Sequence, residues 1–108
     1  MTLAAPRTES VRDGRVYVFA TSDEPATGVA RGKVAIPSLG RRYRLRPTAR
    51  KLSPRTLTRV RLSIPLKSLH AVRAALARHE RLTARIVVAV EDGAGNATTK
   101  TRTIRLRK

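Results

Sequence analysis

The stretch Leu82-Thr-Ala-Arg-Ile-Val-Val-Ala-Val90 sets the fold class of this chain, because its residues repeat with a period of two. One face of the repeat is apolar throughout, with Leu82, Ala84, Ile86, Val88 and Val90. Successive side chains of a β-strand point to opposite faces, so this alternation predicts a strand. Val87 and Ala89 make the second face apolar as well, which predicts a central strand covered on both sides at its end.

Four earlier segments also read as strands, and breaker residues such as Pro37, Gly40 and Pro47 separate them. The segments are Arg15–Thr21, Gly28–Ile36, Arg42–Arg46 and Thr58–Ile64. A Thr-rich run, 97–106, follows the stretch above, and its mixed alternation indicates a bulge or an edge strand. Residues 1–14 read as a lead-in segment with at most a short edge strand, so we expect one domain over 15–108.

The period changes from two to that of a helix after Pro65. No Gly or Pro occurs from Leu66 to Glu80, and Leu66, Leu69, Val72 and Leu76 fall at spacings of three and four. The pattern predicts a helix over about 66–80 that crosses from one sheet to another. With six or seven strands and no alternating helices, we expect a mainly β fold. We expect the strands to pair antiparallel in a sandwich, with the helix as the crossover before the last two strands.

The segment Glu91-Asp-Gly-Ala-Gly-Asn96 joins the two last predicted strands. A calcium loop of the EF-hand type would need a Glu at its twelfth position, and a phosphate loop would need a Gly-Lys-Ser/Thr ending. Neither is present. We interpret the segment as a hairpin turn in which Asp92 accepts backbone hydrogen bonds, while Gly95 and Asn96 tolerate a positive φ.

Together these features resemble the bacterial immunoglobulin-like or fibronectin-III-like repeats of secreted actinobacterial surface proteins. The resemblance rests on the Asp92–Asn96 turn between its two strands, on the Ala/Arg/Leu helix 69–78, and on the Ser22–Pro25 turn. It implies an immunoglobulin-like antiparallel β-sandwich with one helical crossover over about 66–80, before the last two strands. It also implies a non-catalytic structural or adhesion repeat of a larger extracellular protein, with neighbouring repeats as partners and a secreted or cell-surface location. Relatives often flank the Glu-Pro turn with cysteines, where this chain has Thr21 and Thr27. The start MTLAAPRTES has no apolar run of signal-peptide length.

The residue types of known catalytic and metal sites do not come together in this sequence. His70 and His79 would lie on opposite faces of the predicted helix, and the acidic pairs would point apart or face water. There is no nucleophile elbow, and without cysteine there is no thiolate nucleophile or thiolate metal site. We therefore expect no enzymatic activity, no catalytic residue, no metal site, no cofactor and no small-molecule substrate.

Twenty-four basic residues against seven acids give a formal net charge of +17. Such a charge attracts anionic polymers, although a GC-rich genome is an alternative origin for so many arginines. If 42–46 and 57–64 are neighbouring strands, one exposed face carries Arg42, Arg44, Arg46, Arg59 and Arg61. This face is a candidate platform for anionic cell-wall polymers or for non-specific nucleic acid. A small basic nucleic-acid-binding protein is therefore the alternative to a repeat module.

Overall fold

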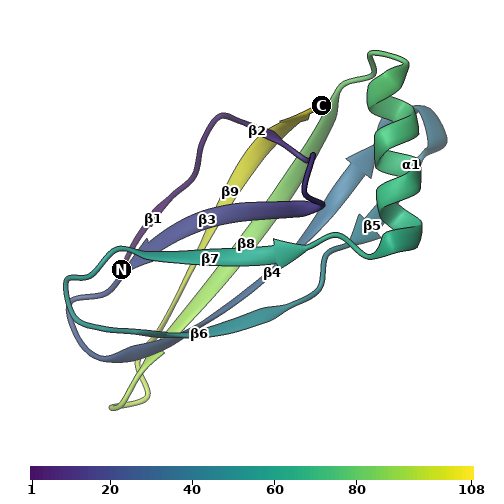
Figure 1. The fold of residues 1–108 in the computed structure, drawn as a ribbon. Helices are drawn as coiled ribbons and strands as arrows, with labels where there is room; N and C mark the ends of the chain where they lie inside the picture. Colours follow the sequence, from purple (N-terminus) through teal and green to yellow (C-terminus); the bar gives the residue numbers. More distant parts are fainter.

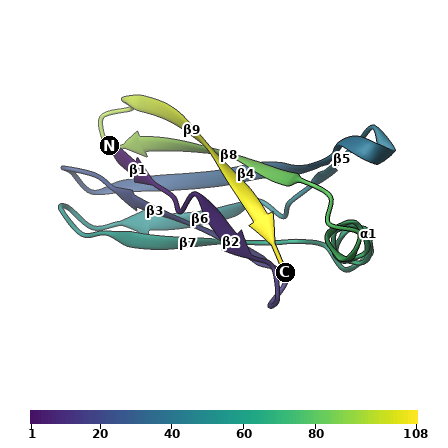
Figure 2. The ribbon, with the colours of Figure 1, turned by 90° about the horizontal axis from the view of Figure 1, so that it is seen from above.

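Two β-sheets pack face to face, and one helix lies at the end of the sandwich (Figures 1 and 2). The computed structural model describes all 108 residues. The first five strands are β1 (Thr2–Ala4), β2 (Thr8–Ser10), β3 (Arg15–Thr21), β4 (Ala26–Ile36) and β5 (Arg41–Arg44). The others are β6 (Thr48–Leu52), β7 (Thr58–Ser63), β8 (Leu82–Asp92) and β9 (Ala97–Arg107). A 3₁₀ turn, η1 (Pro37–Leu39), joins β4 to β5, and the helix is α1 (Leu66–Ala77).

The smaller sheet has the order β1-β3-β7, and the larger one has the order β2-β9-β8-β4-β5, with β6 also paired to β4. The predicted mainly β sandwich is confirmed. It is not purely antiparallel, however, because β2 runs parallel to β9. The chain crosses from the smaller sheet to the larger one between β1 and β2, at Pro6, and it keeps its direction as it does so. A proline suits such a break because it has no N–H to donate to a ladder.

Residues 1–14 belong to the sandwich, and the expected boundary at residue 15 is wrong. This segment forms both β1 and β2, and its Leu3 and Val11 side chains are buried in the core. The sequence pattern missed this because each strand has only three residues, too few to show an alternation. The domain therefore begins at β1.

The helix α1 connects β7 of the smaller sheet to β8 of the larger one, so it is the crossover that the sequence predicted. It ends at Ala77, before the predicted end at Glu80. His79 takes a φ of 58°, and the N–H of Glu80 bonds back to the Ala75 carbonyl, which closes the last turn. Leu66 does not join the buried stripe, because its place in the first turn leaves it 68% exposed.

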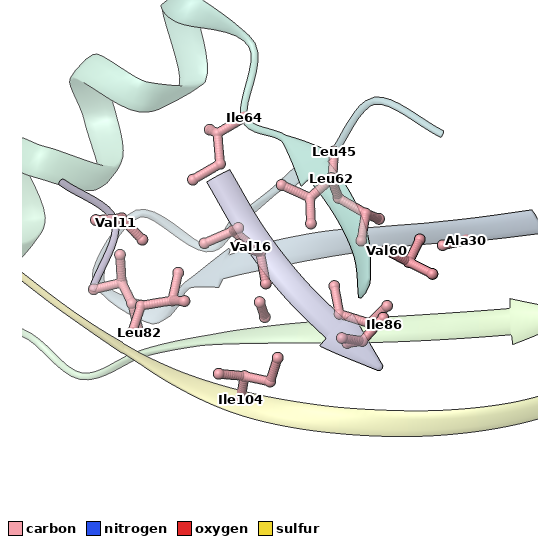
Figure 3. Packing of buried hydrophobic residues seen from close by; sticks show 14 of the residues in the cluster. Val11, Val16, Ala30, Leu45, Val60, Leu62, Ile64, Leu82, Ile86 and Ile104 are labelled. Carbon is pink, nitrogen blue, oxygen red and sulfur yellow. The ribbon is translucent and has the colours of Figure 1, made fainter. Parts of the chain in front are cut away.

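The core lies between the two sheets and is aliphatic. Val16 and Leu62 of the smaller sheet face Leu82, Ile86 and Ile104 of the larger one (Figure 3). The predicted central position of β8 holds, since β4 and β9 flank it. The prediction that β8 is covered on both faces at its end is wrong. No strand or helix lies over the outer face of the larger sheet (Figure 2). Val87 and Ala89 on that face are half-buried.

The strands β5 and β6 are two parts of one edge strand that a β-bulge interrupts. Between the pairs Lys33–Arg44 and Ala30–Thr48, three residues of the edge strand face two residues of β4. Leu45 is buried in the core at the start of the bulge, and the N–H of Arg46 donates to the Ser63 carbonyl of β7 at 2.9 Å. The bulged segment therefore ties the edge of the larger sheet to the smaller sheet.

Candidate anion-binding face

The arginines predicted to form one platform lie in different sheets. The predicted platform therefore does not form. Arg42 and Arg44 belong to β5, which pairs with β4, whereas Arg59 and Arg61 belong to β7, which pairs with β3. The two pairs point outward from opposite sides of the sandwich, and Arg46 lies in the bulge between the sheets. The η1 turn folds β5 back on β4, and this local hairpin keeps β5 away from β7.

A different set of cations comes together on the larger sheet. Arg44, Lys33 and Arg85 form a row across β5, β4 and β8, each directly opposite the next. Residues paired in this way have Cβ atoms about 5 Å apart. All three side chains are exposed. We call these three residues the basic row.

Further arginines flank the basic row on the same outer face. Arg31 lies two residues before Lys33 on β4. On the other side, Arg42 and Arg105 stand at the ends of the next line of paired residues, which runs from β5 through Ala35 and Thr83 to β9. We call the following six exposed residues the basic face: Arg31, Lys33, Arg42, Arg44, Arg85 and Arg105.

No acid neutralises the basic face. The one salt bridge of the molecule joins Arg78 and Glu80 at the end of α1, with 2.7 Å between the Nη2 and Oε2 atoms. The acid on the outer face of the larger sheet is Glu91, which pairs with Thr27. Thr27 lies six residues from Lys33 along β4, a distance of about 20 Å. That exceeds the Debye length of about 8 Å at physiological salt, so Glu91 has little effect on the row.

Most of the acids lie toward one end of the long axis of the molecule. Ala26 pairs with Asp92, so the β3–β4 turn and the β8–β9 hairpin meet at this end. Four of the seven acids lie in or beside these two turns: Asp23, Glu24, Glu91 and Asp92. We call this end the acidic end, although Lys51 and Arg55 lie there as well. The basic face lies toward the other end, beside η1 and α1 (Figure 1).

The side chains between the cations are small and half-buried or exposed. They are alanine, valine and threonine residues such as Ala35, Val87 and Thr103, and no aromatic residue lies on this face. The surface therefore provides exposed cationic groups without a ring to stack on. Guanidinium and ammonium groups form charge-assisted hydrogen bonds with phosphate, sulfate or carboxylate oxygens. The arrangement favours a ligand with many anionic groups over one small anion.

The carboxylate of Asp92 is occupied by the turn in which it lies. Its Oδ1 accepts the N–H groups of Ala94 and Asn96, both at 2.9 Å, and its Oδ2 accepts the Asn96 side-chain amide at 3.1 Å. Gly95 takes a φ of 84°. Hydrogen bonds from the side chain and backbone of Asn96 hold the pKa of Asp92 below its usual value. No group of three or more His, Cys, Asp or Glu side chains is arranged to hold a metal ion.

Sequence reasoning missed the basic row, although part of its signal is present in the alternation. Lys33 lies on the polar side of the predicted strand 28–36, and Arg85 lies on the polar side of 82–90. The missing information was that these two strands pair with each other, and in which register. The register of the hairpin that η1 closes was also needed, because it brings Arg44 opposite Lys33.

No protein-family model matches this chain, and a search of the curated proteins finds no similar sequence. The helix of the molecule is too short and too polar to cross a membrane. Evidence for a role of the basic face therefore comes from its geometry and charge.

Proposed function

We propose that the protein is a non-catalytic β-sandwich module that binds anionic polymers through the basic face. The observation that carries the proposal is the basic row, three cations directly opposite one another across three strands with no acid beside them. Like charges in such positions repel and oppose folding. An anionic polymer relieves this repulsion and releases its own counter-ions as it binds.

A polymer fits this face better than a small anion does. The cations extend over β5, β4, β8 and β9 on an open surface, so each binds a separate anionic group of the ligand. Binding through many exposed cations depends on charge density and little on the chemical identity of the chain. Nucleic acid and acidic cell-wall polymers are both ligands of this kind.

The test is a titration of mixed-sequence duplex DNA and of inorganic polyphosphate by fluorescence anisotropy at several salt concentrations. The wild type should bind both, and the logarithm of its affinity should fall linearly with the logarithm of salt. The triple variant Lys33→Gln/Arg44→Gln/Arg85→Gln should lose up to about 2.7 from the magnitude of the slope on duplex DNA, about 0.9 for each lost phosphate contact.

The matched control is the triple variant Arg12→Gln/Arg50→Gln/Lys67→Gln, which removes the same charge from exposed positions outside the basic face. Its slope should stay close to that of the wild type. Equal losses in the two triple variants would show that net charge alone attracts the polymer. Absence of binding at low salt would reject the proposal altogether.

A repeat module of a larger extracellular protein is the second candidate, and the charge division along the molecule favours it. The N-terminal strand β1 starts beside the acidic end, where Thr2 pairs with Thr21. The C-terminal strand β9 finishes at the basic end, where Leu106 pairs with Leu82 (Figure 1). In a tandem chain the basic end of one copy therefore meets the acidic end of the next.

A fusion of two copies tests this arrangement. The fused domains should melt at a higher temperature than the single domain at low salt, and high salt should remove the difference by screening the charges. Identical melting of the fused and single domains in low salt would count against the repeat role.

A further inference from the structure

The outer face of the smaller sheet carries two of the three aromatic residues of the chain. Tyr17 and Phe19 lie two positions apart on β3, so both side chains are on this face, and both are half-buried. The neighbouring strand β7 places Arg61 directly opposite Tyr17 and Arg59 directly opposite Phe19. Figure 2 shows no strand or helix beyond this sheet, so the face is open.

Contacts within the face fix the tyrosine ring in place. The Tyr17 hydroxyl donates to Asp13 Oδ2 at 2.8 Å, and the Arg59 guanidinium carbon lies 5.1 Å from the centre of the ring. This is a cation–π arrangement. The backbone N–H of Tyr17 donates to Glu9 Oε1 at 2.9 Å, which holds the strand as well. The ring and its arginine are therefore ordered before any ligand arrives.

We infer that this face binds single-stranded nucleic acid. Aromatic rings and guanidinium planes on an open sheet are the groups on which unpaired bases stack, and neighbouring cations hold the phosphates. Here Tyr17 and Phe19 provide the rings. Arg15, Arg59 and Arg61 provide three exposed cations on the same side of the sheet.

The charge of the face fits a polyanion. Two carboxylates lie beside three arginines. The half-buried Glu9 accepts the Tyr17 N–H, and the exposed Asp13 accepts hydrogen bonds from the Tyr17 hydroxyl and from the Arg15 N–H at 3.2 Å. Duplex DNA hides its base faces inside the stack, so the rings favour a single strand. The basic face on the other sheet lacks rings, so this inference does not depend on the proposed function.

The chain allows a direct optical test, because it has no Trp and its second tyrosine, Tyr43, can be changed to Phe. In the Tyr43→Phe background, Tyr17 is the sole tyrosine emitter. Oligothymidylate should quench its emission and bind about 10-fold or more tightly than an abasic phosphodiester of equal length. The ratio follows from stacking worth about 1–3 kcal/mol per base. Duplex DNA should quench it weakly.

Phe19→Val should lower the preference for oligothymidylate about 10-fold or more, because Tyr17 alone is then left to stack on a base, and a thermal melt checks that the variant folds. If it does not fold, Arg59→Gln/Arg61→Gln supplies the second test, and that variant should weaken binding of oligothymidylate. The basic-row triple variant should leave the preference for oligothymidylate unchanged, which separates this site from the proposed function. Equal affinities of the folded wild-type face for oligothymidylate and the abasic chain would overturn the inference.

Discussion

Lys33 on β4 lies directly opposite Arg85 on β8, and Arg44 on β5 lies opposite Lys33 on its other side. The unfolded chain does not hold these three charges together, whereas the folded sheet does. Lys33 is the middle member, so it takes part in both repulsive pairs. The same position that strengthens anion binding therefore weakens the fold.

Replacing Lys33 by Gln should stabilise the free protein. We expect the free energy of unfolding to rise by about 0.2–1 kcal/mol per relieved pair at low ionic strength. The gain should nearly vanish in 1 M salt, where the Debye length is about 3 Å. Urea denaturation at the two salt concentrations measures it, and Lys67→Gln on the exposed side of α1 is the control. An equal gain at both salt concentrations would mean that repulsion is not the cause.

The hairpin at Asp92 should depend on the number of its hydrogen bonds. Asp92→Ala removes every acceptor that holds Ala94 and Asn96, so the melting temperature should fall. Asp92→Asn keeps one carbonyl oxygen, so its melting temperature should lie between those of the Ala variant and the wild type. Since the pKa of Asp92 is lowered in the folded state, its contribution is present above pH 3.8 and is lost as the pH falls further. Melting temperatures at pH 7 and pH 3 check both statements, and equal values for the three proteins would contradict them.

Glu9 should make the protein less stable as the pH rises. Burial is the main cause that raises the pKa of Glu9 to about 7, and the negative charge of Asp13 adds to it. The hydrogen bond from the Tyr17 N–H acts in the opposite direction. An acid with a raised folded pKa contributes stability that is complete below about pH 4.5 and is lost by about pH 7. We expect a loss of about 1–2 kcal/mol, because partial exposure reduces the full effect.

Glu9→Gln provides the matched control for that pH dependence. The amide oxygen still accepts the Tyr17 N–H, but the side chain no longer ionises. The variant should be more stable than the wild type at pH 8 and should show a flatter profile between pH 4.5 and pH 7. A variant with the wild-type slope would assign the dependence to another group.

The elements of this fold were readable from the sequence where the signal is local. The alternation in 82–90 and 58–64, the change of period after Pro65 and the residue types around Asp92 all act over a few neighbouring positions. An alternation that leaves one face apolar is enough to predict a strand, without knowledge of its partners. Strands as short as β1 and β2 are too brief for that signal, and their position depends on partners elsewhere in the chain.

The candidate site could not be read in the same way, because it depends on pairing between distant strands. Arg42 and Arg59 have the same local pattern, yet one faces outward from the larger sheet and the other from the smaller one. Lys33 and Arg85 meet because β4 and β8 pair along nearly their whole length. Register of this kind is set by the packing of the entire core, which no single stretch contains.

Gly32 should be essential to the register of the basic row, because the larger sheet leaves no room beside it. A Cβ atom there would lie 2.7 Å from the Arg85 carbonyl oxygen and 2.6 Å from Ile86 Cδ1. The isoleucine tip can turn away, but the carbonyl belongs to the backbone of β8. Gly32→Ala should therefore cost about 1–3 kcal/mol of unfolding free energy, as overpacking does elsewhere.

Gly28→Ala on the same strand is the matched control. The added Cβ would meet Leu52 Cδ1 at 3.5 Å and Val90 Cγ2 at 3.7 Å, which are ordinary contacts. This variant should be neutral or more stable by up to about 1 kcal/mol, since alanine restricts the unfolded chain. Displacing β8 from Gly32 also moves Arg85 away from Lys33, so Gly32→Ala should weaken polyphosphate binding while Gly28→Ala leaves it unchanged. Denaturation and anisotropy on the two variants test the pair of effects, and equal behaviour in both assays would show that the row does not depend on this close approach.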